Sequence, residues 1–438
     1  MWTQWVFAAV CVGLGLVLQT ALHDQHPHPG QTMCDARKLG LVVIGDDGSL
    51  GRMVLHALDT ISVAQADFCG ASVHIAAVGG SRGYLKHSHG LSWDHLRSLL
   101  NHTTVFHGAN PPNESPSPVD VDSSTNEQVD EPDTDDDGVQ QRDTLRDVLG
   151  DLAAFGHYDK FIVVDCTTTA APGHVDDLIW AKSLGMGLVI ANIQAVAGPW
   201  ASYQSLVLNT AKAKQSSLVA VDATVGRGLP VLSTLARLQA SGDHITLVRG
   251  TFSDAVGHVL AEMEAGSTFG DAVTTVYENG LTEDDPRDDL TGAVLARKAV
   301  VIARMLGKRT DVKDVVVDGL LPRKFTNGTV ASFFHAVGSL NDAFKSKWAD
   351  ATKRGHKLAF VATISDDWAV RISLQSVDHA HILHAAHYGD SVVEIRTTNF
   401  PHGILVQVAK PDAAGTVATI LADIASLSCI LFQRCDLS

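Results

Sequence analysis

The stretch KLGLVVIGDDGSLG, from Lys38 to Gly51, joins a short apolar run to a glycine-rich turn. Apolar residues at helical spacing follow from Arg52 to Val63, and a second apolar run extends from Ala71 to Val78. A strand, a glycine-rich turn, a helix and a strand in this order are typical of the opening unit of a dinucleotide-binding domain. The stretch therefore predicts an α/β fold that begins with a Rossmann-like unit.

The glycines of this turn are the first candidate cofactor residues. Gly45, Gly48 and Gly51 are predicted to lie near the phosphates of a bound dinucleotide. Their spacing is irregular, because Asp47 stands where the second glycine of the usual G-x-G-x-x-G motif would be, and Leu50 where the third would be. An acidic side chain is unfavourable beside a pyrophosphate, so a glycine turn in some other α/β protein is the alternative interpretation.

Arg82 is the candidate for choosing between nucleotides. It ends the segment GGSR, Gly79 to Arg82, directly after the second predicted strand. An acidic residue at this place would bind the ribose hydroxyls of NAD, whereas an arginine suits the 2′-phosphate of NADP. The sequence therefore predicts that NADP(H) is preferred over NAD(H), and the alternative is that Arg82 is an ordinary surface residue.

Further apolar runs alternate with helical patterns along the rest of the chain. The alternation predicts a doubly wound parallel sheet in a nucleotide-binding domain over residues 34–221. Beyond it, a mixed pattern predicts a second, α+β domain over 222–412 and a C-terminal helix, within 413–438, that packs back on the nucleotide domain. The predicted strands are Lys160–Cys166, Gly187–Ala191, Leu218–Val221, Ile245–Gly250, Ala359–Ile364 and Ala369–Val377, and the predicted helices are Val175–Leu184, Gln204–Lys214, Leu229–Gln239, Ser253–Ala265, Phe269–Asn279, Leu290–Leu306 and Ala414–Leu427.

The charge of the chain is concentrated in one segment. The 438 residues carry a net charge of −16, and residues 109–141 hold ten acidic residues, five prolines and no Lys or Arg. A segment with so few aliphatic side chains buries too little apolar surface to offset its ordering entropy, so residues 109–142 are predicted to be a disordered insertion. A binder of nucleic acid usually has a basic face, and the acidic balance disfavours that class.

Residues 1–33 are set apart from the predicted domains. Val6 to Leu18 are thirteen apolar residues, which suits the core of a signal peptide better than a membrane span. Met33 as the true first residue is the alternative, so the chain is expected to be cytoplasmic in one case and secretory or organellar in the other. A membrane association is expected only if this segment is an uncleaved anchor. The six cysteines are scattered, and reduced, buried thiols are expected.

Three later motifs resemble homoserine dehydrogenases. They are DATVGRGLPVLSTL at Asp222, ENGLTEDDPRDDLTG at Glu278 and ARK at Ala296, and VVDCTTTAAP at Val163 fits the same family in order and spacing. The resemblance implies a homodimer with a Rossmann-like domain and a substrate and dimerisation domain. It also implies the NAD(P)H-dependent interconversion of L-aspartate 4-semialdehyde and L-homoserine, a step toward threonine, methionine and isoleucine.

The same resemblance assigns the candidate active-site residues. Lys298 is expected to be the proton donor, and Glu283 and Asp289 are expected to bind the substrate. Asp288 is a further carboxylate suited to the ammonium group of an amino-acid substrate. The alternative for this group is an Asp-rich helix start followed by a solvated lysine, which is common in proteins.

The remaining site residues are also implied by the resemblance. Thr167, Asn192 and Gly280 are expected to contact the nucleotide. A monovalent cation, sodium in the family, is expected to be bound by the side chain of one residue and the backbone carbonyls of three. In this chain those residues are Asp222, Val225, Arg227 and Leu229, and the positive side chain of Arg227 departs from the family pattern.

Several other positions depart from that pattern. The family has a catalytic lysine where this chain has Ile193, and an aspartate one helical turn before Lys298 where this chain has Val294. Residues Lys410–Asp412 replace a glycine-rich segment, and FSDAVGHVL replaces a run of small residues after Phe252. Loss of a general acid or its orienting group typically costs about 10² to 10⁴ in rate. A catalytically impaired homologue is therefore the second hypothesis, and a dehydrogenase for another small amino-aldehyde is the third.

Overall fold

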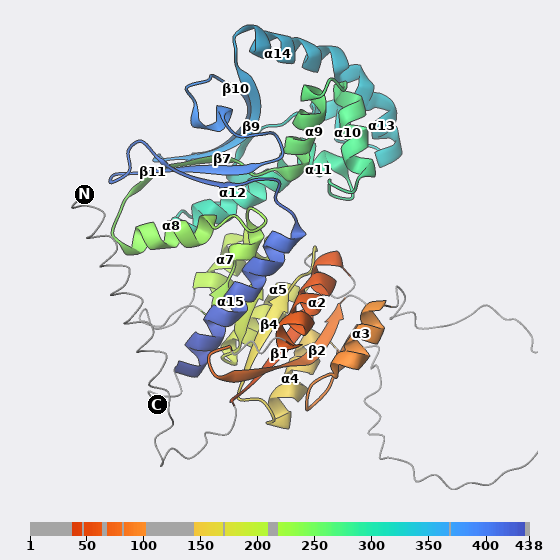
Figure 1. Ribbon diagram of the computed structural model, residues 1–438, viewed down its shortest axis with the longest axis vertical. Helices are drawn as coiled ribbons and strands as arrows, with labels where there is room; N and C mark the ends of the chain where they lie inside the picture. Colours follow the sequence, from red (N-terminus) through yellow and green to blue (C-terminus); the bar gives the residue numbers. More distant parts are fainter. Residues whose placement is uncertain are drawn as a thin grey trace, which may run out of the picture. The chain divides into compact units, whose positions relative to one another are not determined.

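The first sheet has the strand order β3-β2-β1-β4-β5-β6 in this computed structural model (Figure 1). The structure describes residues 37–45, 48–63, 68–80, 83–101, 144–169, 171–208, 218–367 and 369–433. β1, β4, β5 and β6 pair in parallel, and β3 turns back antiparallel on β2. The predicted Rossmann-like α/β class is thereby confirmed. The strands are β1 (Arg37–Ile44), β2 (Ala71–Gly80), β3 (Gly83–Lys86), β4 (Lys160–Asp165), β5 (Gly187–Ile190) and β6 (Val219–Ala220).

Both faces of strand β1 are buried, which explains why its residues are apolar at successive positions. Leu41 and Val43 share a core with helices α2 and α15, which lie on one face of the first sheet (Figure 1). Val42 and Ile44 point to the opposite face and share a core with α4 and α5. A parallel strand covered on both faces needs apolar residues at every position, which is the continuous run seen in the sequence.

The helices around the first sheet are α2 (Ser49–Val63), α3 (Trp93–Asn101), α4 (Leu145–Phe155), α5 (His174–Ser183), α6 (Ile193–Ala197) and α7 (Trp200–Tyr203). Among them, α2 and α5 match predicted helices, whereas α3, α4, α6 and α7 were not predicted. The helical stretch predicted over 204–214 is helical in its described part, where Gln204–Leu208 form a π-helix rather than an α-helix. Lys182 Nζ donates to the carbonyls of Ser205 and Leu206 at 3.1 and 2.7 Å, and a side chain bonded to these carbonyls competes with regular helix pairing.

The second sheet has the order β12-β11-β7-β9-β10-β8 and is antiparallel except for the pairing of β8 with β10. Both sheets belong to one unit, Lys38–Ser438. The strands are β7 (Ile245–Thr251), β8 (Val316–Asp318), β9 (Lys357–Ser365), β10 (Val370–Val377), β11 (Ser391–Thr397) and β12 (Ile404–Val408). The helices of this part are α8 (Val231–Ala240), α9 (Asp254–Glu264), α10 (Phe269–Glu278), α11 (Pro286–Leu290), α12 (Ala293–Met305), α13 (Val330–Val337) and α14 (Asn341–Lys353).

Helices α11 and α12 correct the prediction of one helix over Leu290–Leu306. The break falls at Gly292, whose φ is +84°, a conformation that residues with a Cβ rarely adopt. A Cβ at this position would also come within 2.9 Å of Val317 Cγ1. The break starts α12 at Ala293 and places Lys298 in its second turn.

Helix α15 (Ala413–Gln433) packs its apolar face, including Ile420 and Ile424, into the core of the first sheet. It is long and apolar enough to cross a membrane, a property of no other helix in the described ranges. Its apolar face is buried, and a disulfide described below ties the helix to the first sheet. Both features are typical of a helix in the core of a folded domain.

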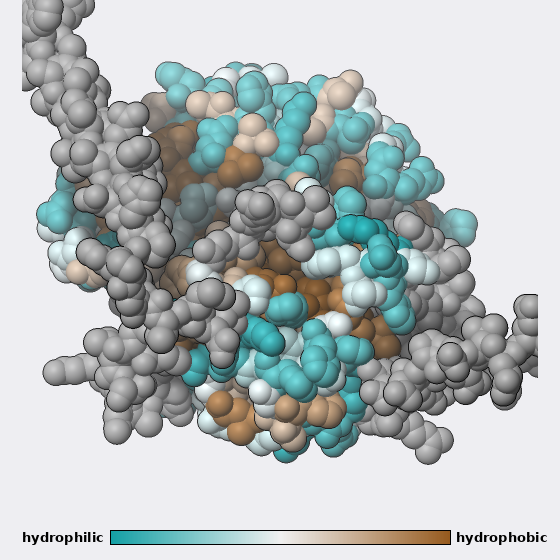
Figure 2. All heavy atoms as spheres, turned by 60° about the horizontal axis from the view of Figure 1, so that its bottom comes forward, coloured by the Kyte–Doolittle hydropathy of each residue, from teal (hydrophilic) through white to brown (hydrophobic). Residues whose placement is uncertain are grey.

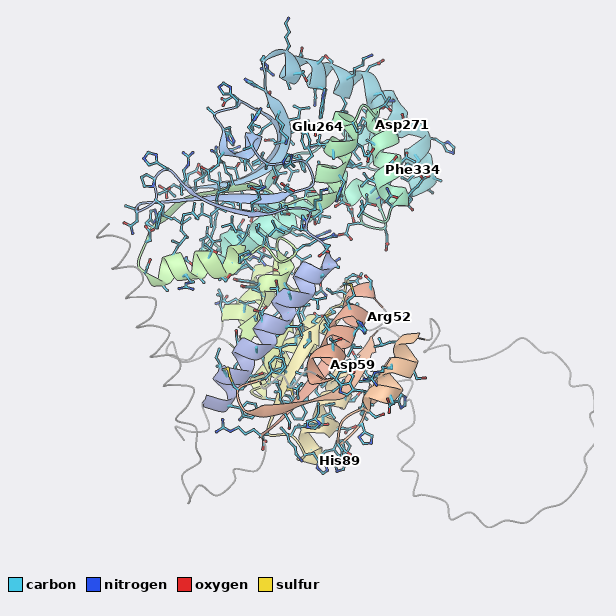
Figure 3. The ribbon with its side chains drawn as sticks, viewed as in Figure 1. Arg52, Asp59, His89, Glu264, Asp271 and Phe334 are labelled. Atoms are coloured by element: carbon cyan, nitrogen blue, oxygen red, sulfur yellow. A yellow bond between two sulfur atoms is a disulfide. The ribbon has the colours of Figure 1, made fainter. Side chains whose placement is uncertain are left out.

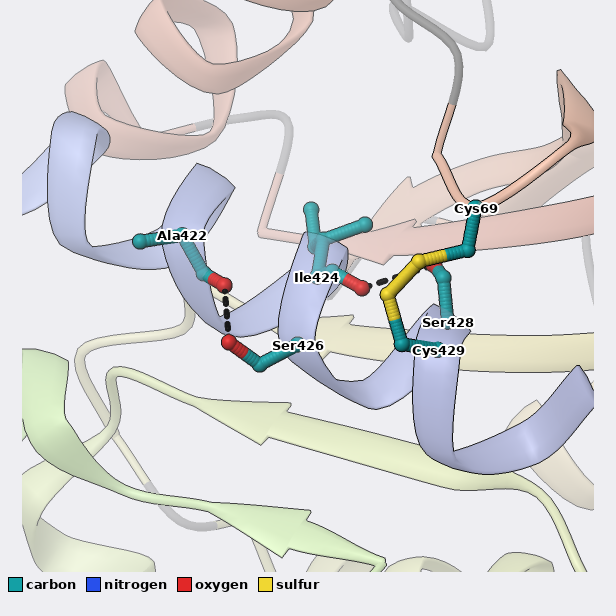
Figure 4. The surroundings of a disulfide bond; sticks show 6 residues. All are labelled: Cys69, Ala422, Ile424, Ser426, Ser428 and Cys429. Atoms are coloured by element: carbon teal, nitrogen blue, oxygen red, sulfur yellow. Dashed lines mark hydrogen bonds between the residues drawn. A yellow bond between two sulfur atoms is a disulfide. The ribbon is translucent and has the colours of Figure 1, made fainter. Parts of the chain in front are cut away.

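A disulfide joins Cys69, in the turn directly before β2, to Cys429 of α15 (Figure 4). The expectation of reduced thiols is therefore wrong for these two residues, because the fold brings together cysteines 360 positions apart. Cys166 is free and buried, and its burial raises the pKa of its thiol.

Several predictions lie outside the described residues. They concern the leader at 1–33, the insertion at 109–142, and the side chains of Asp47 and Arg82.

The surface is mixed in character. On the face drawn in Figure 2, hydrophobic residues are visible between areas of hydrophilic ones. Exposed large hydrophobic side chains include Val316 and Val317 on β8 and Leu405 on β12. These two strands form the two edges of the second sheet.

Candidate active site

Lys298 lies where the second turn of α12 meets the end of β7. Its Nζ donates to the backbone carbonyl of Phe252 at 2.9 Å and lies 3.8 Å from Oδ2 of Asp254. Only 13% of the side chain is exposed, so the ammonium is largely shielded from bulk water. The interpretation as a solvated lysine is wrong for this residue.

Asp289 provides the buried carboxylate of the site. Its residue is 5% exposed, and Oδ2 accepts a hydrogen bond from the backbone NH of Glu283 at 2.9 Å. Burial raises the pKa of Asp289 to about 7; the Glu283 hydrogen bond and the charge of Lys298 oppose the rise, and the charges of Glu283 and Asp254 add to it. The four residues Lys298, Asp289, Glu283 and Asp254, which we call the lysine cluster, are thus electrostatically linked.

Asp288 is not part of the lysine cluster. It is exposed on α11, and its charge acts on Arg287. Arg287 pairs with Asp285 at 2.5 Å, and Asp285 caps the start of α11 by accepting from the NH of Arg287. The two adjacent aspartates of the motif therefore face different surroundings, because neighbouring positions on a helix point about 100° apart.

Asp254 was not a candidate in the sequence. Its Oδ2 lies 3.0 Å from Nε of Arg227, and its Oδ1 accepts from Ser391 Oγ at 3.3 Å. The only signal was the replacement of a run of small residues after Phe252. A local departure of that kind does not reveal that the new carboxylate meets a lysine 44 positions further along the chain.

Gly45, Thr167 and Asn192 come together at the carboxyl ends of β1, β4 and β5. Gly45 has a φ of +93°, and a Cβ there would lie 2.8 Å from the backbone N of Thr167. Asn192 donates from Nδ2 to Thr167 Oγ1 at 2.7 Å, and its Oδ1 caps the start of α6. The carboxyl edge of a doubly wound sheet is where such folds bind nucleotides.

Asp165 and His174 add a buried ion pair behind that edge. His174 Nε2 lies 2.8 Å from Asp165 Oδ2, and Asp165 Oδ1 accepts from Thr167 Oγ1 at 2.6 Å. Burial disfavours the charged imidazole, but the hydrogen bond and charge of Asp165 prevail and raise the pKa of His174. The pair holds Thr167 in place, and the sequence offered no spacing signal for it.

The turn after β1 fits a dinucleotide in its described part. Gly48 donates to the carbonyl of Gly45 at 3.1 Å, and α2 begins directly afterwards with no acidic residue in its first turn. Gly51 is buried in that turn, as close packing of helix on sheet requires. Gly280, the remaining candidate, is exposed in the turn after α10, with a φ of +67°.

Around the predicted cation residues, the structure adds a second carboxylate. Burial raises the pKa of Asp222, and burial together with the charge of Asp222 raises the pKa of Asp423 on α15 to about 7. Asp423 Oδ2 is buried with no hydrogen-bond partner among the described residues. Facing acidic groups of this kind fit a cation, whose charge would stabilise both carboxylates.

The carbonyls predicted to complete the cation site lie in the turn after Asp222. The carbonyl of Arg227 faces the start of α15, since a Cβ at Gly415 would lie 2.5 Å from it. The carbonyl of Leu229 accepts from Val231 N at 2.7 Å, and Val225 is buried. In the described part of the chain, no group of three or more His, Cys, Asp or Glu side chains is placed to hold a metal.

Ile193 and Val294 have apolar side chains, and each of them packs in the interior of the protein. Ile193 begins α6 and packs against the core, and Val294 in the first turn of α12 is 7% exposed. Lys410, in the segment expected to be glycine-rich, adopts a φ of +45°, and Asp412 accepts from Gly415 N near the start of α15.

A pocket lies away from the lysine cluster. It has a volume of about 810 Å³ and is lined by the α9–α10 connection and by α14, with Phe269, Lys345 and Trp348 among its residues. Figure 3 labels Glu264 and Asp271 on the two connected helices. The pocket shares no residue with the lysine cluster.

Residues 230–425 match the model of a protein family described as homoserine dehydrogenase. A bifunctional aspartokinase/homoserine dehydrogenase from Haemophilus influenzae is 31% identical over 282 residues, which are 64% of this chain and 34% of that protein. A homoserine dehydrogenase from Paracoccidioides brasiliensis is 28% identical over 60% of this chain and 73% of its own length. The chain thus spans about a third of the first bifunctional relatives it matches.

Among solved structures, a hyperthermophilic archaeal homoserine dehydrogenase in complex with NADPH has a TM-score of 0.61. It is 14% identical, and the match covers 88% of this chain and 96% of that one. At this identity the likeness concerns the fold.

Proposed function

We propose that the chain is a homoserine dehydrogenase that interconverts L-homoserine and L-aspartate 4-semialdehyde with a nicotinamide dinucleotide, on the basis of the family model that matches residues 230–425 and of its similarity to homoserine dehydrogenases. The observation that carries the proposal is the lysine cluster. It places a shielded ammonium, Lys298, within electrostatic reach of Asp289, a carboxylate whose pKa is raised to about 7. A proton donor beside an acidic recognition group is what the reduction of an amino-aldehyde requires.

The roles of the residues follow from their chemistry. A bound nicotinamide dinucleotide supplies a hydride to the aldehyde carbon and takes one from the alcohol carbon in the reverse direction. Lys298 donates a proton to the aldehyde oxygen as the alcohol forms, and its neutral amine accepts the hydroxyl proton in reverse. Glu283 and Asp289 bind the ammonium group of the substrate. Reduction therefore consumes one hydride and one proton per aldehyde.

The nucleotide is proposed to bind at the edge formed by Gly45, Thr167 and Asn192, with its pyrophosphate at the start of α2. A relative of the same fold is described in complex with NADPH, which supports a nicotinamide cofactor. The preference for NADP(H) depends on Arg82. Sodium at Asp222 and a homodimer are proposed from the family resemblance, and the unpartnered oxygen of Asp423 supports the cation.

A catalytically impaired homologue is the second candidate. Two observations favour it: Ile193 packs against the core, and Val294 is buried. Neither side chain can donate a proton or orient an ammonium. Such a protein would keep the fold and nucleotide edge without turnover.

The test is homoserine-dependent formation of reduced nicotinamide by the purified chain, with NADP and with NAD. Lys298→Ala is expected to lower kcat by about 10² to 10⁴, because it removes the general acid. Lys313→Ala, at an exposed lysine, is the matched control and is expected to leave kcat unchanged. Absence of turnover in the unaltered protein with either nucleotide would sink the proposal and favour the second candidate.

A further inference from the structure

We propose that Asp254 is the positioning residue for Lys298, in place of the carboxylate that the family resemblance leads us to expect at Val294. The inference rests on the proposed function, because the group it positions is the proton donor of that reaction. It also assigns a role to a segment that, in the sequence, was only a departure.

One short segment, residues 252–254, contacts the surroundings of the Lys298 ammonium at two points. Phe252 contributes its carbonyl at 2.9 Å and Asp254 its Oδ2 at 3.8 Å. The side chains of Lys298 and Asp254 are 13% and 9% exposed. With so little water between them, the charge of Asp254 acts on the ammonium more strongly than an exposed partner would.

Asp254 is held in place independently of Lys298. Arg227, from the turn before α8, lies 3.0 Å from Oδ2, and Ser391, from the start of β11, donates to Oδ1 at 3.3 Å. Asp254 is also the first residue of α9, where the helix dipole favours a negative charge. The carboxylate is therefore oriented before any substrate binds.

The two departures at Arg227 and Asp254 form one unit. Each is a charge where the family pattern has none, and the structure joins them in an ion pair. The pair offers a carboxylate to Lys298 from α9, whereas the expected aspartate would reach it from position i−4 of its own helix. Val294 occupies that position and is buried and apolar.

Several charged groups surround Lys298, and the charges of Lys298, Glu283 and Asp254 all act on Asp289. Asp254 comes from α9, Asp289 from α11, Glu283 from the loop before α11, and Arg227 from the turn after Asp222. Asp254 is the only carboxylate within 4 Å of Nζ among the described residues. Its removal should therefore make the ammonium less stable and its orientation less defined.

The experiment compares Asp254→Asn with the double variant Asp254→Asn/Val294→Asp. We expect Asp254→Asn to lower kcat by roughly 10- to 100-fold, with the KM for the nucleotide unchanged and the pH profile of kcat shifted. The double variant should recover at least about tenfold, because it returns a carboxylate at the i−4 position. Asp271→Asn, in the first turn of the neighbouring α10, is the matched control and should do neither.

A second measurement does not need turnover. Labelling the protein with isotope-enriched lysine gives an NMR signal for the Nζ of Lys298, assigned with Lys298→Arg. Asp254→Asn should shift and broaden this signal, because the ammonium loses its nearest carboxylate. If the signal changes while the unaltered protein shows no turnover, the positioning stands and the proposed function fails. An unchanged signal, or loss of thermal stability alone, would overturn the positioning role.

Discussion

Helix α12 carries two buried cationic side chains that have different roles. Arg304, near the end of the helix, has a side chain with 0% exposure, and Lys298, near its start, retains 13%. Arg304 also lies over the rings of Trp200 and Tyr203. The acceptors of Arg304 are the carbonyls of Val196 at 2.7 Å, Gly198 at 2.6 Å and Thr310 at 2.9 Å, and Asp311 Oδ1 at 2.8 Å.

Lys298, by contrast, has donors to spare. An ammonium has three N–H donors, and Lys298 uses one of them on a carbonyl, with its nearest carboxylate at 3.8 Å. Arg304 uses four of its five N–H donors on protein acceptors and holds segments together, whereas Lys298 keeps two donors that can serve a substrate. The comparison separates a structural cation from a reactive one on a single helix.

The largest expected effect is on stability and concerns Arg304, the structural cation of this comparison. Arg304→Ala is expected to lower the free energy of unfolding by about 3 to 5 kcal/mol, because it leaves Asp311 and three carbonyls without their buried donor. Lys298→Ala is expected to change it by less than about 1 kcal/mol, since it removes one hydrogen bond and Asp254 keeps its ion pair with Arg227. Urea unfolding followed by circular dichroism measures both, and equal losses would contradict the distinction.

The disulfide is a second structural tie, from α15 to the turn directly before β2. Cys429→Ser is expected to lower the free energy of unfolding by about 2 to 4 kcal/mol, because the cross-link restricts the unfolded chain. A reducing agent should destabilise the unaltered protein equally and leave Cys429→Ser unaffected. Should reductant have no effect on the unaltered protein, the cross-link contributes nothing to stability.

The pH dependence of Asp289 tests the surroundings of Lys298, the reactive cation of this comparison. Its pKa is raised from 3.8 to about 7, so between these values the folded state binds a proton that the unfolded state has released. Its contribution to stability is therefore present at low pH and lost as pH rises through this window, at about 1.4 kcal/mol per unit at most. Substrate affinity should run the opposite way, with the KM for homoserine falling up to about tenfold per unit as the carboxylate forms.

Asp289→Asn is the variant that checks this pH dependence. Its unfolding free energy, measured between pH 4 and pH 8, should lack the slope attributed to Asp289. A KM for homoserine that stays constant through pH 7 in the unaltered protein would contradict a substrate-binding carboxylate at this position.

The smallest expected effect is a gain. Ile193→Lys restores the lysine expected from the family pattern at the start of α6 and should raise kcat by about tenfold, against the losses typical of removing such a group. Ile193→Leu is the control, since it keeps the apolar packing. A rate unchanged by Ile193→Lys would indicate that the surroundings of this position no longer support catalysis.

Local patterns were sufficient for much of the fold. The apolar runs at β1, β4 and β5 identified the first sheet, because a strand buried on both faces shows itself in consecutive residues. β11 and β12 were missed. Polar residues such as Glu394 and Gln407 interrupt their apolar residues, and β7, the other partner of β11, lies far earlier in the chain than any short window of sequence contains.

The candidate site was predictable only in part. The motif around Glu278 and Ala296 pointed to Lys298 and Asp289, and the structure links them electrostatically. It did not distinguish Asp288 from Asp289, because their difference comes from where a five-residue helix turns each side chain. Asp423 was also missed, since its relation to Asp222 depends on how α15 packs.

The sequence by itself determined the central strands of the first sheet, many of the helices, and which family's motifs the chain carries. These are properties of neighbouring residues, set by side-chain volume, polarity and backbone preference. Only the tertiary structure decided which carboxylate meets Lys298, which cation is enclosed by backbone carbonyls, and which cysteines join. Such properties depend on residues tens to hundreds of positions apart coming within a few ångströms, and spacing along the chain carries no record of that distance.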